Sequence, residues 1–177
     1  GPVGRDPLHI TDPRLDESIV QAPIVEQFDP AKLSPAQLAQ ATRIVTRAKR
    51  TDAMLRMLAA LCAVERHPDQ QLAVDVIADA IETADEKQLT NELAAALGKL
   101  PVESNLHPKA AALHANVLLW RVADFKAAAS MLEPFMARDS ANLKRLRMTA
   151  LLLDGRVDDA RAILAQLPDD VLSLIHI

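Results

Sequence analysis

The 177-residue sequence has few of the residues on which several classes of protein depend. It has one cysteine, Cys62, so an intrachain disulfide and a Cys-x-x-Cys site are both excluded. Glycine occurs only at positions 1, 4, 98 and 155, which leaves no glycine-rich phosphate-binding loop. Aromatic residues are 2% of the chain and tyrosine is absent, so a folded core must be built from aliphatic side chains.

Long apolar runs and an excess of positive charge are missing as well. No uninterrupted apolar run approaches the roughly 20 residues that cross a bilayer, so we expect no membrane insertion. The net charge of −4 argues against a general nucleic-acid binder, which would carry a basic face. The five histidines are scattered and no His-Glu-x-x-His motif is present. We therefore predict no catalytic residue, no metal and no cofactor.

Half of the residues in the chain are apolar, and alanine and leucine are the most frequent of them. These are among the strongest helix formers, so we predict an all-α fold with little or no sheet. Capping residues followed by helical periodicity mark eight helices in four pairs, and Pro134 is expected to break the sixth. The second helices of the pairs are expected to begin at Asp52, Asp85, Asp124 and Arg156, at intervals of 33, 39 and 32 residues.

Two predicted turns can be aligned with each other: Ala123–Ala128 and Gly155–Ala160. Each has a small residue, a polar one, an apolar one and then an alanine three residues further on. The small residue permits a tight helix ending, and Phe125 or Val157 is expected to fill the gap between the helices. Ala128 and Ala160 lie 32 residues apart, and a helical hairpin that recurs at such a period is typical of a solenoid.

The run Asp154–Ala160 resembles the inter-helix turn of a tetratricopeptide repeat, and the turn at Phe125 resembles a second copy. The resemblance implies a right-handed α-solenoid of about four antiparallel hairpins. It also implies that the surface of the first helices binds peptides or partner proteins. A HEAT-like or irregular stacking of α-hairpins is the alternative architecture.

Three regions are predicted. Residues 1–33 carry five prolines and are expected to be an extended, proline-rich leader. Because Ile19, Val20, Ile24 and Phe28 are apolar, this leader should lie across the first hairpin; the alternative is that it fills the solenoid's groove or docks on a partner. Residues 34–170 form the helical repeat domain. Residues 171–177 resemble a non-native tail.

Charge is distributed unevenly along the chain. Residues 34–68 carry a net charge of +4, and residues 69–106 carry −6. Basic residues on the first predicted helix and acidic residues on the third recur at helical spacing, so each set is expected to line one face. The two faces should either pair as exposed salt bridges, which is the favoured interpretation, or form a charged groove. The candidate partner-binding residues are Arg43, Arg47, Arg50, Asp75, Asp79, Glu82, Asn116, Lys144, Arg145 and Arg147.

The function that these observations favour is a non-catalytic scaffold or adaptor that binds a peptide or a partner protein. An accessory or regulatory domain of a larger enzyme, or of a secretion or assembly system, is the alternative. A third, less favoured function is that of a carrier for an apolar ligand, because an aliphatic helical core can hold lipid. The sequence fixes neither the partner nor the oligomeric state, and a homodimer is open. A cytoplasmic location is slightly favoured, with a periplasmic one open if a signal was removed.

Overall fold

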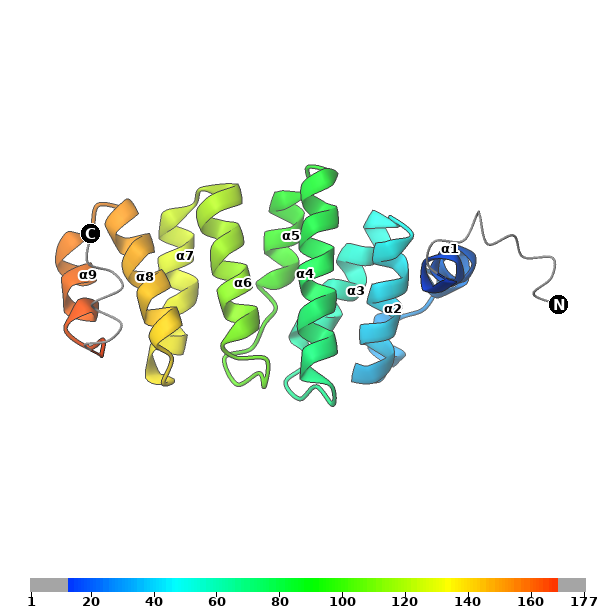
Figure 1. Ribbon diagram of the computed structural model, residues 1–177, viewed down its shortest axis with the longest axis horizontal. Coiled ribbons are helices and arrows are strands. Elements are labelled where there is room, and N and C mark those ends of the chain that lie inside the picture. The colour runs from blue at the N-terminus through cyan, green and yellow to red at the C-terminus, as the bar shows by residue number, and fades with distance from the viewer. Residues whose placement is uncertain (1–12, 169–177) are drawn as a thin grey trace.

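A computed structural model of the chain describes residues 13–168, which are helical and contain no strand (Figure 1). The all-α prediction is therefore confirmed for this part of the chain. The predicted tail at residues 171–177 and the first twelve residues lie outside it. The α-helices within the described range are α1 (Pro13–Val25), α2 (Pro35–Arg47), α3 (Thr51–Ala63), α4 (Gln70–Glu86), α5 (Thr90–Leu97), α6 (Lys109–Val117), α7 (Phe125–Leu132), α8 (Ala141–Leu153) and α9 (Val157–Leu164).

Helices α2 to α9 stand side by side in a row of four antiparallel pairs (Figure 1). The pairs are α2 with α3, α4 with α5, α6 with α7, and α8 with α9. Neighbouring first helices contact each other along the row, α2 with α4, α4 with α6, and α6 with α8. The predicted neighbourhood of the first and third helices of the repeat domain is therefore confirmed.

The caps that start the helices are local side-chain interactions. Ser34 and Gln37 form a capping box at the start of α2, where Pro35 occupies the first turn. Asp69, Asp124 and Ser140 accept a hydrogen bond from a first-turn N–H of α4, α7 and α8. Two predicted caps are wrong. Asp52 lies inside the first turn of α3, and Asp85 lies within α4, which continues to Glu86.

The four turns inside the hairpins share one backbone conformation. A single residue of each turn has a positive φ: Lys49 at 59°, Gln88 at 57°, Ala123 at 58° and Gly155 at 78°. The residue that follows donates its N–H across the turn and also caps the next helix. In three turns this bond spans five residues, as in Arg50 to Val45 and Arg156 to Leu151, which is the bond of a Schellman motif. The four hairpins therefore share a turn with one left-handed residue in their backbone geometry.

The third turn differs by one residue. Its Asp124 N–H bonds to the carbonyl of Leu118, six residues back. The cause is a π-helical turn, η3 (Leu118–Val122), which continues α6 and adds one residue before the turn. Pro134 breaks α7 as predicted, since α7 ends at Leu132 and a 3₁₀ segment, η4 (Glu133–Ala137), follows it. A second 3₁₀ segment, η2 (Pro30–Lys32), precedes α2.

The core is aliphatic and runs along the row between the two layers of helices. Met57, Leu58, Leu93 and Leu132 are fully buried. Phe135 is the single aromatic residue among the buried hydrophobic residues of the described range. Ala128 and Ala160 are buried, as close helix approach requires, but Val157 is exposed and does not fill the gap between α8 and α9. That expectation for Val157 was wrong because α9 is the last described helix and no further hairpin packs on it there.

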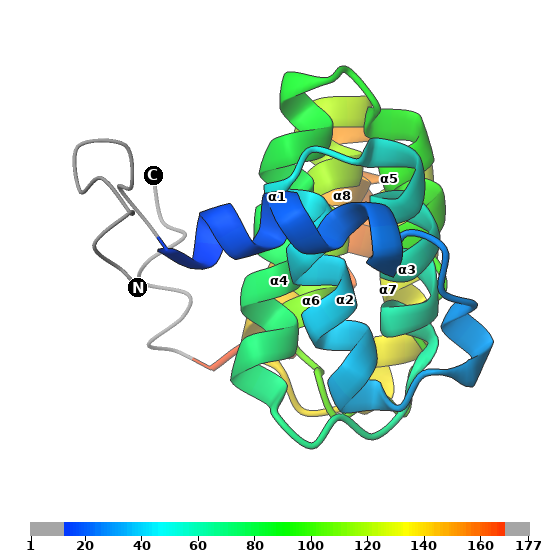
Figure 2. The ribbon, with the colours of Figure 1, turned by 90° about the vertical axis from the view of Figure 1, so that its right-hand side faces the viewer.

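The leader is not extended where the structure describes it. Residues Pro13–Val25 form α1, with Pro13 at its first position, where a helix leaves the N–H unpaired, and with Pro23 inside the helix near its end. Helix α1 crosses the end of the row against α2 (Figure 2). Ala22 and Val25 are buried there. This part of the leader therefore lies across the first hairpin as expected, but Ile19, Val20, Ile24 and Phe28, the apolar residues that motivated the expectation, are exposed.

Candidate functional site

The first helices of the four hairpins, α2, α4, α6 and α8, form one layer of the molecule (Figure 1). Their outward sides carry most of the polar residues that the sequence singled out. We call this surface the first-helix face. Its residues are Arg43 and Arg47 on α2, Asp75, Asp79 and Glu82 on α4, Asn116 and Trp120 on α6 and its extension η3, and Asn142 and Arg145 on α8.

Basic and acidic residues of the first-helix face meet between α2 and α4. Arg47 and Lys49 line a surface hollow of about 320 Å³ together with Asp79, Glu82 and Glu86. Lys49 Nζ lies 3.2 Å from Glu86 Oε2, and both side chains are about half exposed. Arg47 of the predicted basic set and Asp79 and Glu82 of the predicted acidic set therefore border the same hollow, whereas the ion pair beside it joins Lys49 and Glu86, which belong to neither set. An exposed pair of this kind contributes ~0–1 kcal/mol.

Arg50 does not belong to this face. Helix α2 ends at Arg47, and the left-handed residue Lys49 reverses the chain before Arg50. Arg50 caps α3, and its Nη1 lies 3.7 Å from Glu26 Oε1 at the end of α1. The predicted alignment of three arginines on one helix face is wrong for Arg50, because the helical spacing does not continue through the turn.

The acidic residues of α4 all lie at exposed positions. Asp75 Oδ1 accepts a hydrogen bond of 2.8 Å from Gln71 Nε2 on the same helix. Asp85, near the helix end, pairs with Arg121 at 2.6 Å between Oδ2 and Nε. This pair ties the end of α4 to the end of η3 and leaves Asp79 and Glu82 beside the α2 hollow. Two helices thus contribute opposite charges to one continuous surface.

Trp120 is exposed to 60%. Its indole Nε1–H donates a 3.1 Å hydrogen bond to Asn116 Oδ1, one helical turn back. Asn116, a predicted site residue, therefore orients an exposed aromatic ring. Exposed tryptophans are frequent anchors in protein interfaces. The sequence carried a weak signal for this, namely the Asn–Trp spacing of four residues, but nothing that showed which side of the helix is exposed.

The three basic residues of α8, Lys144, Arg145 and Arg147, have different surroundings. Arg147 Nε donates to the Ala129 carbonyl at 3.2 Å, so this arginine joins α8 to α7. Arg145 Nη2 donates to Asn142 Oδ1 at 2.7 Å on the same helix. Asn142 and Arg145 are three residues apart and so share one side of α8. Lys144 is half-buried and lies elsewhere on the helix. The structure brings Arg145 but not Arg147 to the first-helix face.

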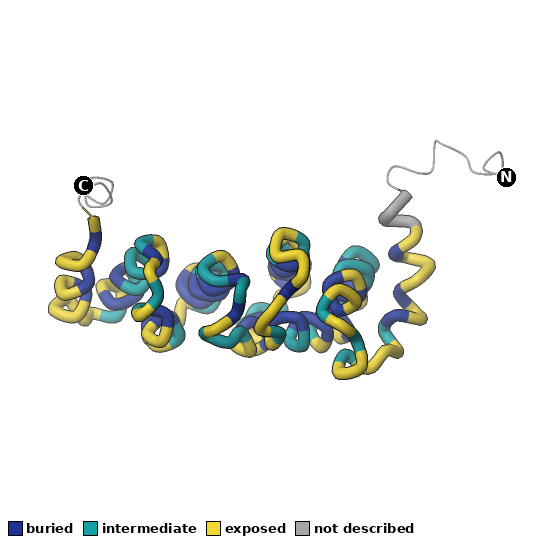
Figure 3. The backbone as a smooth tube through the Cα atoms, turned by 90° about the horizontal axis from the view of Figure 1, so that it is seen from below, coloured by how far each residue is buried: buried dark blue, intermediate teal, exposed yellow. Residues whose placement is uncertain are grey.

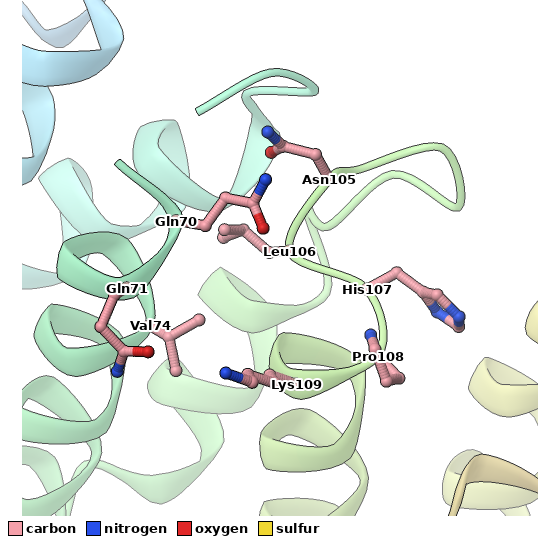
Figure 4. Close-up of a pocket in the computed structure, with 8 residues that line it drawn as sticks. All are labelled: Gln70, Gln71, Val74, Asn105, Leu106, His107, Pro108 and Lys109. Carbon is pink, nitrogen blue, oxygen red and sulfur yellow. The ribbon is translucent and has the colours of Figure 1, made fainter. Parts of the chain in front are cut away.

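A further hollow of about 270 Å³ lies between the start of α4 and the segment that leads into α6 (Figure 4). Gln70, Gln71 and Lys109 border it, and the buried Leu106 contributes to its wall. The loop that forms one side is anchored by Asn105, whose amide accepts from the His67 N–H at 2.9 Å and donates to the His67 carbonyl at 3.0 Å.

Within the described range, His67, His107, His114 and Cys62 have structural surroundings. Burial lowers the pKa of His114 to about 4 and raises the pKa of the Cys62 thiol to about 12. The ring of His107 stacks on Phe135 with 5.7 Å between centroids, and burial, followed by the nearby charge of Arg138, lowers its pKa. His67 also has a lowered pKa because of burial, although its bond to the Val64 carbonyl opposes this.

Comparisons of the chain with protein-family models, curated proteins and solved structures found no match. In the described part of the chain, no three His, Cys, Asp or Glu side chains are placed to hold a metal ion. None of the helices from α1 to α9 combines the length and the hydropathy of a membrane span.

Proposed function

We propose that the chain is a tetratricopeptide-like, right-handed α-solenoid that acts as a non-catalytic scaffold. In this proposal the first-helix face binds a peptide or a segment of a partner protein. The four hairpins with one turn geometry support the architecture, because a repeated hairpin that buries its sides against its neighbours is how solenoids are built.

The observation that carries the binding proposal is the composition of the first-helix face. It joins opposite charges on α2 and α4 to an exposed Trp120 held by Asn116. Charged side chains around an aromatic anchor give a partner both orientation and contact area. The two stripes remain partly exposed, so a partner's charges can reach them.

Two variants with equal changes in charge test which layer binds. The first-layer variant combines Arg47→Gln, Asp79→Asn, Glu82→Gln and Arg145→Gln. The control combines Asp52→Asn, Glu92→Gln, Lys126→Gln and Arg161→Gln, with one exposed residue on each of α3, α5, α7 and α9. Each variant loses two positive and two negative charges, so the net charge is unchanged.

The wild-type chain and both variants are immobilised and exposed to the same bacterial lysate, and each retained protein is quantified. We expect a protein that the wild type and the control retain equally and that the first-layer variant loses. Purified, that protein should also shift the emission of Trp120, the one tryptophan in the chain, to shorter wavelength. Equal retention by both variants, or loss by the control alone, would refute the proposed face.

A further inference from the structure

The outward side of α1 carries a group of exposed apolar residues. Ile19, Val20 and Ile24 are exposed to 56%, 74% and 65%, and Phe28, just beyond the helix, to 42%. Pro23 lies exposed among them. Single exposed apolar residues are ordinary, but a contiguous group of this size on one helix is typical of an interaction surface.

The opposite side of α1 is already occupied. Ser18, Ala22 and Val25 are buried against the first hairpin, and Figure 3 shows the buried residues of α1 facing the row and the exposed ones facing away. Glu26 holds the end of the helix, because its carboxylate pairs with Arg50 at 3.7 Å and its carbonyl accepts from Arg56. The apolar side is therefore presented by a docked helix at the end of the row.

The charge of this surface favours one kind of partner. The exposed polar residues on its border are Glu17, Gln21 and Gln27, and none of these is basic. Glu17 is the one charged residue among these three, so a strongly acidic partner would find no complementary charge, whereas two copies packed antiparallel place their Glu17 side chains on opposite sides of the two-fold axis. An apolar centre with a polar, amide-bearing rim is the usual anatomy of a homodimer interface.

We propose that α1 binds α1 of a second copy of this chain. The two helices pack antiparallel about a two-fold axis, which joins two rows end to end at their α1 ends (Figure 2). A two-fold contact is closed, so assembly stops at the dimer. This inference does not depend on the first-helix face, which lies along the row and stays accessible in the dimer.

The mass in solution, measured by analytical ultracentrifugation from about 1 to about 100 µM, tests the proposal. The wild-type chain should approach twice the monomer mass of 19.3 kDa. Val20→Glu with Ile24→Glu places a carboxylate in the apolar centre and should weaken association by at least about 100-fold, with helicity unchanged. The matched control, Leu152→Glu with Leu153→Glu, adds the same charges to exposed leucines of α8 and should remain dimeric.

Three results would overturn the proposal. One is a wild-type chain that stays monomeric throughout. Another is a full-length chain that is monomeric and dimerises only when residues 1–12 are removed, since that segment would then be what binds the apolar side of α1. The third is association that the α8 variant abolishes and the α1 variant keeps.

A single introduced cysteine distinguishes the two-fold arrangement from a head-to-tail one. Val20 lies near the middle of α1, so Val20→Cys should meet its own copy across the axis and form a disulfide-linked dimer on oxidation. Cys62 is buried and leaves the background low. Leu152→Cys should not cross-link. Cross-linking by Leu152→Cys alone would contradict an α1 contact.

Discussion

At the scale of single residues, the fold depends on buried histidines that must stay neutral. His114 is buried among aliphatic side chains at the start of the third hairpin, and its pKa falls to about 4 because burial disfavours the charged ring. In the unfolded chain the ring keeps its ordinary value of 6.5. Between these values the unfolded state binds a proton that the folded state does not.

His114 should therefore make stability depend on pH. The free energy of unfolding should be highest above about pH 6.5, where His114 is neutral in both states. It should fall by about 3 kcal/mol as the pH drops toward 4, because only the unfolded state then binds the proton. Urea unfolding at several pH values checks this. His114→Leu should flatten the dependence, with a remainder from His67 and His107, whose pKa values are lowered in the same direction. An unchanged slope in the variant would contradict this role.

The left-handed turn residues give a second prediction at this scale. Gly155 has a φ of 78° and an added Cβ would meet nothing within 4 Å, so Gly155→Ala isolates backbone strain. We expect it to destabilise the chain by about 1 kcal/mol. Ala123 has a φ of 58°, and Ala123→Gly should stabilise by up to about 1 kcal/mol. Thermal unfolding measures the stability of both variants. If both substitutions stabilised the chain, or both destabilised it, the two turns would not share one conformation.

At the scale of elements, the segment between α5 and α6 is held by Asn105. Its side chain satisfies both the N–H and the carbonyl of His67, and its own N–H donates to the Glu65 carbonyl at 2.9 Å. This small set of bonds fixes the segment that leads into α6. It thereby helps to set the spacing of the second and third hairpins.

Asn105→Ala should cost about 2 kcal/mol in the free energy of unfolding, because it leaves buried polar groups of His67 without partners. Asn105→Asp keeps the acceptor but sets a carboxylate oxygen against the His67 carbonyl oxygen, so it should cost at least as much. Glu103→Gln in the same segment is the control and should change stability by less than about 0.5 kcal/mol. Equal effects of Asn105→Ala and Glu103→Gln in urea unfolding would show that the bonds do not anchor the loop.

The helices could be predicted from the sequence wherever a local signal marks them. Ser34-Pro35, Asp124 and Pro134 act on the backbone within a turn, so the sequence placed those boundaries correctly. The α4–α5 turn was misplaced because Gln88 adopts the left-handed conformation without a glycine to signal it. Helix α1 was missed because the prolines were taken to exclude a helix, whereas α1 begins at Pro13 and contains Pro23 within its last turn.

The candidate site was less accessible to sequence reasoning, because exposure depends on neighbouring helices. Trp120 is apolar by residue type, yet its side chain is exposed to 60%. Arg50 and Arg147 have the right type and spacing, but a turn redirects the first and the Ala129 carbonyl engages the second. Arg47, Asp79 and Glu82 came together as expected because α2 and α4 are neighbours.

At the scale of the whole molecule, stability should vary along the row. Helix α4 is covered by α2, α3, α5 and α6, whereas α9 packs on α8. In arrays whose units contact only their neighbours, the end units open more easily. Hydrogen exchange should therefore show opening free energies for amides of α9 lower than those of α4 by at least about 2 kcal/mol. Uniform protection from α2 to α9 would indicate one globally cooperative unit instead.

The central claim, that the first helices present the binding surface, is tested most directly by hydrogen exchange with and without the protein captured from lysate. We predict added protection, and reduced Trp120 exposure, in α2, α4, η3 and α8, with α3, α5, α7 and α9 unchanged. The measurement is repeated with the α1 variant Val20→Glu with Ile24→Glu, in which dimer formation through α1 cannot add protection of its own. Protection confined to the second helices, or to α1 in the wild-type chain, would contradict the account.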